Sequence, residues 1–404
     1  MRRRFINNVN TTFANYMFVE SLYNETNISI SKCSPTLMYK VDDTNWEIVG
    51  DNKFDYTLSH VGEKIFFKDV RYTTPSGVGM FTANVGFKVG GDFRSLFLGD
   101  NVKENSPLLD FCFEKMFMNS NIECFDEDIL YYPILANHCY YRMFAGCHKI
   151  TTPPKLPAMI LANYCYSGMF ENCSNLEVVF KLPATKLAQS CYSYMFYGCT
   201  SLTTAPELPA TSLANNCYGG MFQNCTSLTS APALPATSLA SYCYSGIFKG
   251  CSKLNYIKML ATNISATDCL NSWVNGVASI GTFVKNPNMT SLPTAKDYNY
   301  YAGIPSGWTV VNDGEESGVS GKIVNHGVMT ISKTLKSFNA KIVFEFPCAS
   351  TISINVITSL VPAIYGVSEG NAYVQFSGVG EFQSFTFTPT EDDTYIYEIE
   401  VKIE

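Results

Sequence analysis

The chain has 404 residues, of which 46% are hydrophobic and 16% are charged, and its mean hydropathy is +0.02. This composition excludes a disordered chain and is sufficient for about two or three folded domains. The net charge of −7 and the pI of about 5.3 argue against a protein that binds nucleic acid through phosphate contacts. No nucleic-acid partner is therefore expected.

The N-terminus begins with Arg2, Arg3 and Arg4, but residues 6–12 are mostly polar and lack the apolar core of a signal peptide. The sequence contains no run of about 18 apolar residues, so it predicts no membrane-spanning helix and no membrane partner. We expect from this start a chain that remains in the cytoplasm unless another route releases it, such as assembly into a virus particle.

Residues 20–100 alternate short apolar and polar runs, separated by turn signals such as Asp42-Asp43 and Gly50-Asp51. Alternation with a period of two is typical of half-buried strands. Strands are expected at residues 28–30, 37–40, 46–49 and 64–67. Residues 1–105 are therefore predicted to form an N-terminal β domain, a small sandwich that is a candidate anchor.

A repeat with a period of 26 residues occupies the middle of the chain. Each unit carries a Cys-Tyr pair, a Met-Phe or Ile-Phe pair, and a second cysteine. The Cys-Tyr pairs start at Cys139, Cys165, Cys191, Cys217 and Cys243, and the second cysteines are Cys147, Cys173, Cys199, Cys225 and Cys251. Such self-similarity marks stacked units that share one core, and it predicts a solenoid over residues 106–310 with atypical end units at Cys112 and Cys269.

Within one unit, the segment from Leu202 to Leu208 is short and bears Thr and Pro, which predicts a short strand that ends at Pro209. Apolar residues from Leu213 to Phe222 fall at offsets of 0, 1, 4, 8 and 9, which fit one face of a short helix. The fold class expected for the chain is therefore mostly β with short helices (α+β), a solenoid flanked by β-sandwich domains.

The repeated cysteines have two interpretations. Equivalent positions in a stack lie about 5 Å apart, so vertical disulfides are geometrically allowed. A long chain with 15 cysteines does not resemble a small secreted disulfide framework, however, and the thiol is among the most buried side chains. Two ladders of reduced thiols that face the core are therefore favoured.

The unit pattern Cys-x-x-Leu-x-x-Ala-Pro-x-Leu-Pro-x-x-x-Leu-Ala-x-x-Cys-Tyr-x-x-Met-Phe resembles the BspA-like leucine-rich repeats, and at least five units match it. Residues 79–82 and 96–101 also look like the lead-in of such proteins. These repeats are common in surface proteins of gut Bacteroidetes and recur in the crAss-like phages that infect them. The resemblance implies a curved slab with parallel strands on its concave face, and a role in adhesion or recognition.

The C-terminal part begins with an acidic, Gly- and Ser-rich segment, residues 311–321, that is expected to be a linker. Residues 322–404 then show several runs typical of strands. Strands are expected at residues 328–332, 341–346, 351–356, 373–376, 385–387 and 395–402. Strands at this spacing predict an immunoglobulin-like β-sandwich.

The sequence shows no catalytic or metal-binding constellation. The acids between residues 139 and 269 are scattered, and the four histidines have no recognisable triad context. The Cys and His residues at 138–139 and 147–148 could ligate zinc, but both cysteines belong to the repeat pattern and the other units lack the histidines. The sequence predicts no cofactor, no metal and no enzyme, with a solenoid carbohydrate-active enzyme as the minority alternative.

Binding is the favoured role, because residues 139–269 carry eight Lys and Arg against four Asp and Glu and are rich in hydroxyl and aromatic groups. Surfaces of that kind suit sugars. The candidate positions lie on the predicted concave strand face: Thr152, Val178, Thr204, Ser230, Tyr256, Lys155, Lys181 and Glu207. The alternative is that these are ordinary solvated positions without a ligand, and the repeated tyrosines from Tyr140 to Tyr244 are interpreted as structural.

These features predict a non-enzymatic phage virion protein, a head or tail fibre or decoration protein that adheres to host surface glycan or mucus. The expected partners are other virion proteins and host surface polysaccharide or protein. A homo-oligomer is a further candidate, although no heptad repeat supports it. The alternative is a bacterial cell-surface leucine-rich-repeat adhesin.

Overall fold

The structure is a computed structural model, and it describes residues 16–69, 79–103, 106–126, 129–178, 180–290, 292, 294–295 and 303–313, together with seven strands between residues 329 and 402. Over these residues the chain is mostly β, with one short α-helix, α1 (Ser95–Leu98), which continues into a 3-10 turn, η1 (Gly99–Asn101). The chain divides into two compact units, residues 1–313 and 314–404.

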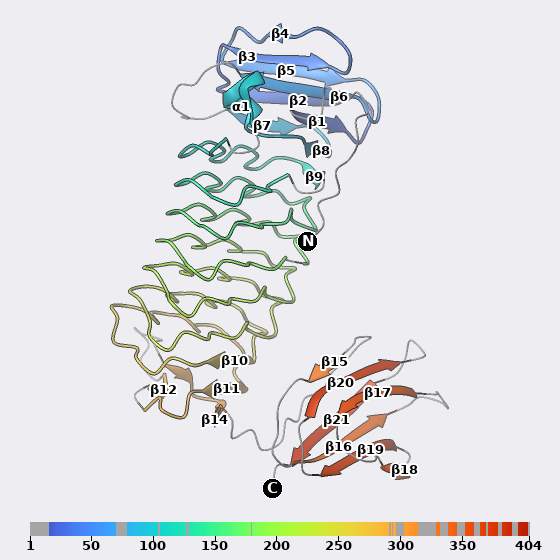
Figure 1. Ribbon diagram of the computed structural model, residues 1–404, viewed down its shortest axis with the longest axis vertical. Helices are drawn as coiled ribbons and strands as arrows, with labels where there is room; N and C mark the ends of the chain where they lie inside the picture. The colour runs from blue at the N-terminus through green and yellow to red at the C-terminus, as the bar shows by residue number, and fades with distance from the viewer. Residues whose placement is uncertain are drawn as a thin grey trace. The chain divides into compact units, whose positions relative to one another are not determined.

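The first unit begins with two sheets (Figure 1). The strand order of the larger sheet is β4-β3-β6-β1-β8-β9, and that of the smaller is β5-β2-β7. The strands are β1 (Met17–Ser21), β2 (Thr26–Ser31), β3 (Leu37–Val41), β4 (Glu47–Ile48), β5 (Lys53–Leu58), β6 (Lys64–Asp69), β7 (Met80–Ala83), β8 (Phe87–Gly90) and β9 (Ile122–Phe125). The rings of Phe54 in β5 and Phe81 in β7 both meet Phe67 in β6 edge to face, with centroids 5.6 and 5.3 Å away, so the two sheets share an aromatic core.

A buried polar cluster joins these sheets to the first repeats. Arg94 is 2% exposed and pairs with Asp92 at 2.7 Å. Tyr131 and Tyr132, which belong to the repeat region, donate their hydroxyls to the Asp92 carboxylate at 2.8 Å each. Burial alone would raise the pKa of Asp92, but the hydrogen bonds from Arg94 and the two tyrosines outweigh it and hold that pKa below its ordinary value.

Beyond this cluster the chain runs in turns that lie one on another, each turn being one repeat unit (Figure 1). Neighbouring turns are joined through their backbones. Tyr218 N, for example, donates to Cys243 O at 3.1 Å, and Phe222 N donates to Ile247 O at 3.0 Å. We call residues 106–278 the stacked region; in it, each turn supplies backbone hydrogen-bond partners to its neighbours.

The short helix predicted from Leu213 to Phe222 is wrong, because this segment is a chain of turns. Successive backbone amides donate alternately within the unit and to the next unit. Met221 N donates to Tyr218 O in the same unit, whereas Gly220 N donates to Ser245 O in the next unit. The φ angle is positive at every fourth residue, at Asn216, Gly220 and Asn224 (54°, 61° and 63°), which no right-handed helix tolerates. The apolar offsets of 0, 4 and 8 that suggested a helix fit this period of four equally well.

Identical side chains from successive turns form the core of the stacked region. The five repeated tyrosines are at most 1% exposed, and the rings of Tyr166 and Tyr192 lie 5.8 Å apart and 6° from parallel. The rings of Phe196 and Phe222 repeat this arrangement at 5.8 Å and 9°. Both cysteine series are buried, as predicted, and the fourteen described cysteines are all free thiols.

The strand predicted between Leu202 and Leu208 is reduced to an isolated parallel bridge at Thr204. Among its described residues, the stacked region forms full strands only near its two ends, β9 near the first and β10 (Tyr256–Met259) near the second. At the second end, β10, β11 (Gly281–Lys285) and β14 (Trp308–Asn312) form a parallel sheet, beside the pair β12 (Thr294–Ala295) and β13 (Ile304–Pro305). Val311 and Asn312 therefore belong to β14 rather than to the predicted linker.

The second unit, taken by itself, contains two antiparallel sheets with the orders β15-β20-β17 and β18-β19-β16-β21. The strands are β15 (Met329–Ile331), β16 (Phe338–Glu345), β17 (Ile352–Thr358), β18 (Ile364–Ser368), β19 (Asn371–Gly378), β20 (Phe382–Pro389) and β21 (Tyr395–Lys402). Six of these lie where the sequence predicted strands, and β18 was missed. The segment predicted as a linker lies from residue 314 onward outside the described residues.

Candidate functional site

The strand side of the stacked region, the side that carries the parallel bridges, brings three of the predicted site residues into one column. Parallel bridges join Thr204 to Ser230 and Ser230 to Tyr256. The column continues beyond the prediction through Thr282 in β11 and Thr309 in β14, which pair in register with Tyr256. The repeat interval of 26 counted onward from Tyr256 reaches Thr282, whereas Thr309 lies one residue beyond the next interval, so the sequence held the signal for Thr282 alone.

The other predicted positions lie on the same side but contribute few groups that could recognise a ligand. Thr152 is exposed and Val178 is 48% exposed, at the equivalent positions of earlier units. Lys155 is exposed as well. Lys181 and Glu207 pair with each other at 3.2 Å, with side chains 72% and 75% exposed, and thus cancel each other's charge.

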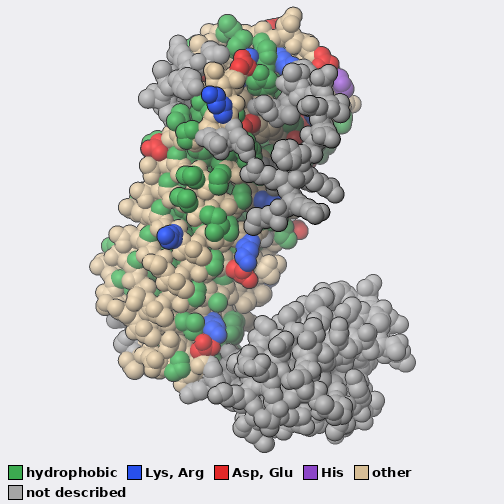
Figure 2. All heavy atoms as spheres, in the orientation of Figure 1, with side chains coloured by type: hydrophobic (Ala, Val, Ile, Leu, Met, Phe, Trp, Pro, Cys, Tyr) green, Lys and Arg blue, Asp and Glu red, His purple; other side chains and the backbone are tan. Residues whose placement is uncertain are grey.

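The column is therefore a row of neutral, hydroxyl-bearing side chains, of which Thr204, Ser230 and Thr309 are exposed and Tyr256 and Thr282 are partly exposed. Figure 2 shows the same character more widely, since charged side chains are few on the visible face of the stacked region. Exposed apolar side chains also occur in the first turns, where Ile134 and Ile160 (59% and 57% exposed) face each other across a parallel bridge. Such a surface can contact neutral polymers, but it has no group arranged for acid–base chemistry.

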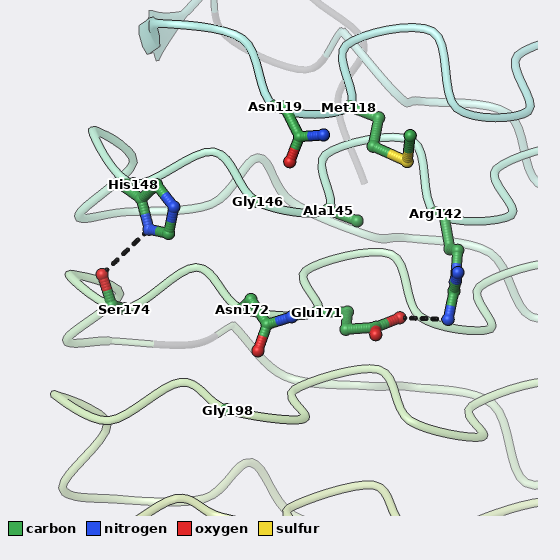
Figure 3. A pocket seen from close by; sticks show the side chains of 10 residues that line it. All are labelled: Met118, Asn119, Arg142, Ala145, Gly146, His148, Glu171, Asn172, Ser174 and Gly198. Atoms are coloured by element: carbon green, nitrogen blue, oxygen red, sulfur yellow. Dashed lines mark hydrogen bonds and ion pairs between the residues drawn. The ribbon is translucent and has the colours of Figure 1, made fainter.

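The sequence did not predict a second feature, a cavity of about 460 Å³ (Figure 3). It lies on the turn side of the stacked region, which we define as the side formed by the consecutive turns around the second cysteine of each unit. Its lining residues come from four successive turns. Arg142 and Glu171 stand at one side of it, and His148 and Ser174 at the other. Glu171 is the one carboxylate among the described residues that line it, so the paired carboxylates of a glycosidase are not found here.

Two polar pairs define the cavity. Arg142 Nη2 lies 2.9 Å from Glu171 Oε2, and His148 Nδ1 lies 3.1 Å from Ser174 Oγ. Gly168 makes the first pair possible, because a Cβ at that residue would lie 2.9 Å from Arg142 Cγ and 3.1 Å from Glu171 Oε2. The carboxylate oxygen Oε2 is buried and is held by this ion pair with Arg142.

The cysteines and the histidines that were considered for zinc have different environments. Cys139 and Cys147 are fully buried, and Cys147 Sγ donates to Phe117 O at 2.9 Å. His138 stacks between the rings of Phe111 and Tyr164, with centroids 4.6 Å away on each side. No group of three or more metal-ligating side chains occurs in the described part of the chain. Nor does any helix in that part have the length and apolarity needed to cross a membrane.

Burial raises the pKa of the thiols and phenols in the core. Burial raises the pKa of Cys147 to about 11 and that of Cys251 to about 12, so both stay protonated near neutral pH. Burial likewise raises the pKa of Tyr166 and Tyr192 well above the ordinary value. The interpretation of the tyrosine series as structural agrees with this burial and with the stacked rings.

Comparison with protein-family models, with curated proteins and with solved structures gives no match to this chain. The likeness to BspA-like repeats therefore depends on the residues of the repeat unit alone.

Proposed function

We propose that the chain is a non-enzymatic adhesion protein that binds glycan, and that it is carried on a phage particle. The observation that carries this proposal is the column from Thr204 to Thr309, a row of neutral side chains that are exposed or partly exposed on the stacked region. Neutral hydroxyl-bearing rows offer a polysaccharide repeated hydrogen bonds without the charge that would select an ionic partner.

The fold interpretation is part of the same proposal. The stacked region is interpreted as a leucine-rich-repeat solenoid of the BspA-like kind, and the C-terminal unit as an immunoglobulin-like sandwich. The mutual backbone hydrogen bonds of successive turns support the first interpretation. The seven antiparallel strands in two sheets support the second.

The placement on a virion is supported by the likeness of the repeat unit to repeats that recur in phages of gut Bacteroidetes. One terminal domain would then join the protein to other virion proteins, and the stacked region would contact host polysaccharide or protein. A bacterial cell-surface adhesin remains the alternative, because the same repeats occur on the surface of the host bacteria.

Mass spectrometry distinguishes these two locations. Particles purified from an infected culture of gut Bacteroidetes and outer membranes of uninfected cells are digested and quantified side by side. The proposal predicts peptides of this chain in the particles, at a constant ratio to capsid protein through successive purification steps. Peptides found only in the uninfected membranes would replace the virion protein with the bacterial adhesin.

A further inference from the structure

We propose that the turn-side cavity around Ala145 and Gly146 is a binding site for one neutral sugar unit. This inference deepens the proposed glycan binding and rests on it for the class of ligand. It places the specific contact on a different surface from the strand column, at a single place in the stack rather than along it.

The cavity exists because one turn lacks side chains that the other turns have. The two positions before the second cysteine are Ala145 and Gly146 here, the smallest pair in the series, and Ala145 is only 6% exposed. The equivalent pairs are Met118-Asn119, Glu171-Asn172, Tyr197-Gly198, Gln223-Asn224, Lys249-Gly250 and Asn275-Gly276. At least one side chain fills this row in every other turn, so the gap is local to one unit.

The neighbouring turns surround this gap with polar groups. Asn119 and Met118 lie on one side along the stack, and Asn172 and Gly198 on the other (Figure 3). The Asn119 Oδ1 atom would lie 2.1 Å from a Cβ at Gly146, so any residue except glycine would push this amide aside. Gly146 also has a φ of 73°, which favours glycine independently.

The groups around the gap are balanced between donors and acceptors. Arg142 and the amides of Asn119 and Asn172 donate, while Glu171 and Ser174 accept. The Arg142 side chain is 41% exposed and can donate to a ligand, while its Nη2 also lies 2.9 Å from the buried Glu171 Oε2. Glu171 thus holds the Arg142 guanidinium beside the gap, where its remaining N–H groups can donate to ligand hydroxyls.

This chemistry selects the class of ligand. The formal charges of Arg142 and Glu171 cancel, so neither a phosphate nor a divalent cation is favoured. A sugar ring presents several hydroxyls that both donate and accept, and an apolar ring face that can lie on Ala145 and Met118. The volume of about 460 Å³ falls within the range of about 300–1,000 Å³ typical of small-ligand sites.

Saturation-transfer NMR on the full chain tests this inference. The probes are the methyl glycosides of glucose, galactose, mannose and N-acetylglucosamine, with methyl glucuronide as the charged comparison. The test variant is Ala145→Met, which places in the gap the side chain that Met118 supplies one turn earlier. The matched control is Gln223→Met, which makes the same side chain at the equivalent row away from the cavity.

We expect at least one neutral glycoside to bind the wild type and Gln223→Met equally, and to bind Ala145→Met at least tenfold more weakly. Glu171→Gln, which keeps the size of the side chain, should weaken the same glycoside and serves as the second variant if Ala145→Met fails to fold. Equal binding to Ala145→Met or to a folded Glu171→Gln, binding of the glucuronide alone, or no binding of any glycoside would overturn the inference.

A separate assay with whole capsular polysaccharide keeps this result distinct from the proposed function. Polymer bound by the wild type without any glycoside response would reject the cavity and retain the adhesion protein. A glycoside response that Ala145→Met removes, without polymer binding, would retain the cavity and reject the adhesion protein.

Discussion

The interior and the exterior of the stacked region differ in how regularly their side chains repeat. Inside, each turn repeats the same side chains, so that Tyr192 lies on Tyr166 and Phe222 on Phe196. Outside, the row that contains Ala145 changes from turn to turn, with Glu171 and Tyr197 as its next members. The uniform interior determines the stack, and the variable exterior is where one turn can differ from the rest and bind a ligand.

The two surfaces of the exterior differ as well. The strand column is regular and continues through Thr282 and Thr309, whereas the cavity depends on a single irregular pair, Ala145-Gly146. A regular row can contact a polymer in many registers, while an irregular gap can select one sugar. Variants that separate interior from exterior, and one surface from the other, are therefore the informative ones.

The largest expected effect is in the interior. Phe196→Ala should lower the free energy of unfolding by about 3–5 kcal/mol, because it removes a buried ring that stacks on both neighbours and leaves a cavity. Its control, Tyr194→Ala, removes a side chain that is 45% exposed and should change stability by about 0.5 kcal/mol or less. Urea unfolding measures both, and equal losses would remove the distinction between interior and exterior.

Asp92→Asn tests whether a buried charge is as important as the apolar interior. It leaves Arg94 buried without its anionic partner and should cost about 3–5 kcal/mol. Since the folded pKa of Asp92 is depressed, its contribution is complete above the unfolded pKa of about 3.9 and is lost as the pH falls through the folded value. Unfolding curves between pH 6 and pH 2 should therefore be flatter for the variant, and parallel curves would contradict this role.

Cys199→Ala tests whether the buried thiols stabilise the stacked region, with a smaller expected loss of stability. The Cys199 thiol donates to Phe170 O at 3.2 Å, an oxygen that also accepts from Cys173 N. Loss of this bond and of the buried sulfur should cost about 1–2 kcal/mol in urea unfolding. No change in stability would show that the thiols merely occupy space.

The last prediction compares the reactivity of a partly exposed thiol with that of the buried thiols. Burial raises the pKa of ladder cysteines such as Cys147 and Cys251 and also that of Cys124, but Cys124 is partly exposed whereas the other two are fully buried. Iodoacetamide at pH 8 should modify Cys124 much faster than the ladder cysteines, which should stay intact until urea is added. Peptide mass spectrometry reports each site, and rapid labelling of Cys147 in the native protein would contradict its burial.

The sequence predicted the interior well because the interior is periodic. Burial of the cysteines, of Tyr166 and of Phe170 followed directly from the repeat. The turn conformation from Leu213 to Phe222 was not predictable from apolar spacing, because a period of four in turns and a period of 3.6 in a helix place the same residues inside. What distinguishes them is the positive φ at Asn216 and Gly220, which the repeated cysteines and leucines do not reveal.

The exterior was predicted only in part. The strand column could be found because it shares the period. Its continuation to Thr282 follows the period but was missed, and Thr309 lies one residue off the period. The cavity could not be found by periodicity, because it arises where the period is broken at Ala145. It also needs Gly168 to admit the contact between Arg142 and Glu171, a relation between turns that only coordinates reveal.

The measurement that tests the central claim most directly is the binding of the full chain to host capsular polysaccharide, with the length of the polymer followed by size-exclusion chromatography. The account predicts that the polymer retains the chain on co-sedimentation, that Thr204→Glu with Ser230→Glu weakens this retention, and that the polymer length stays constant. A polymer that passes unbound, or one that is shortened during incubation, would contradict a binding protein without enzymatic activity.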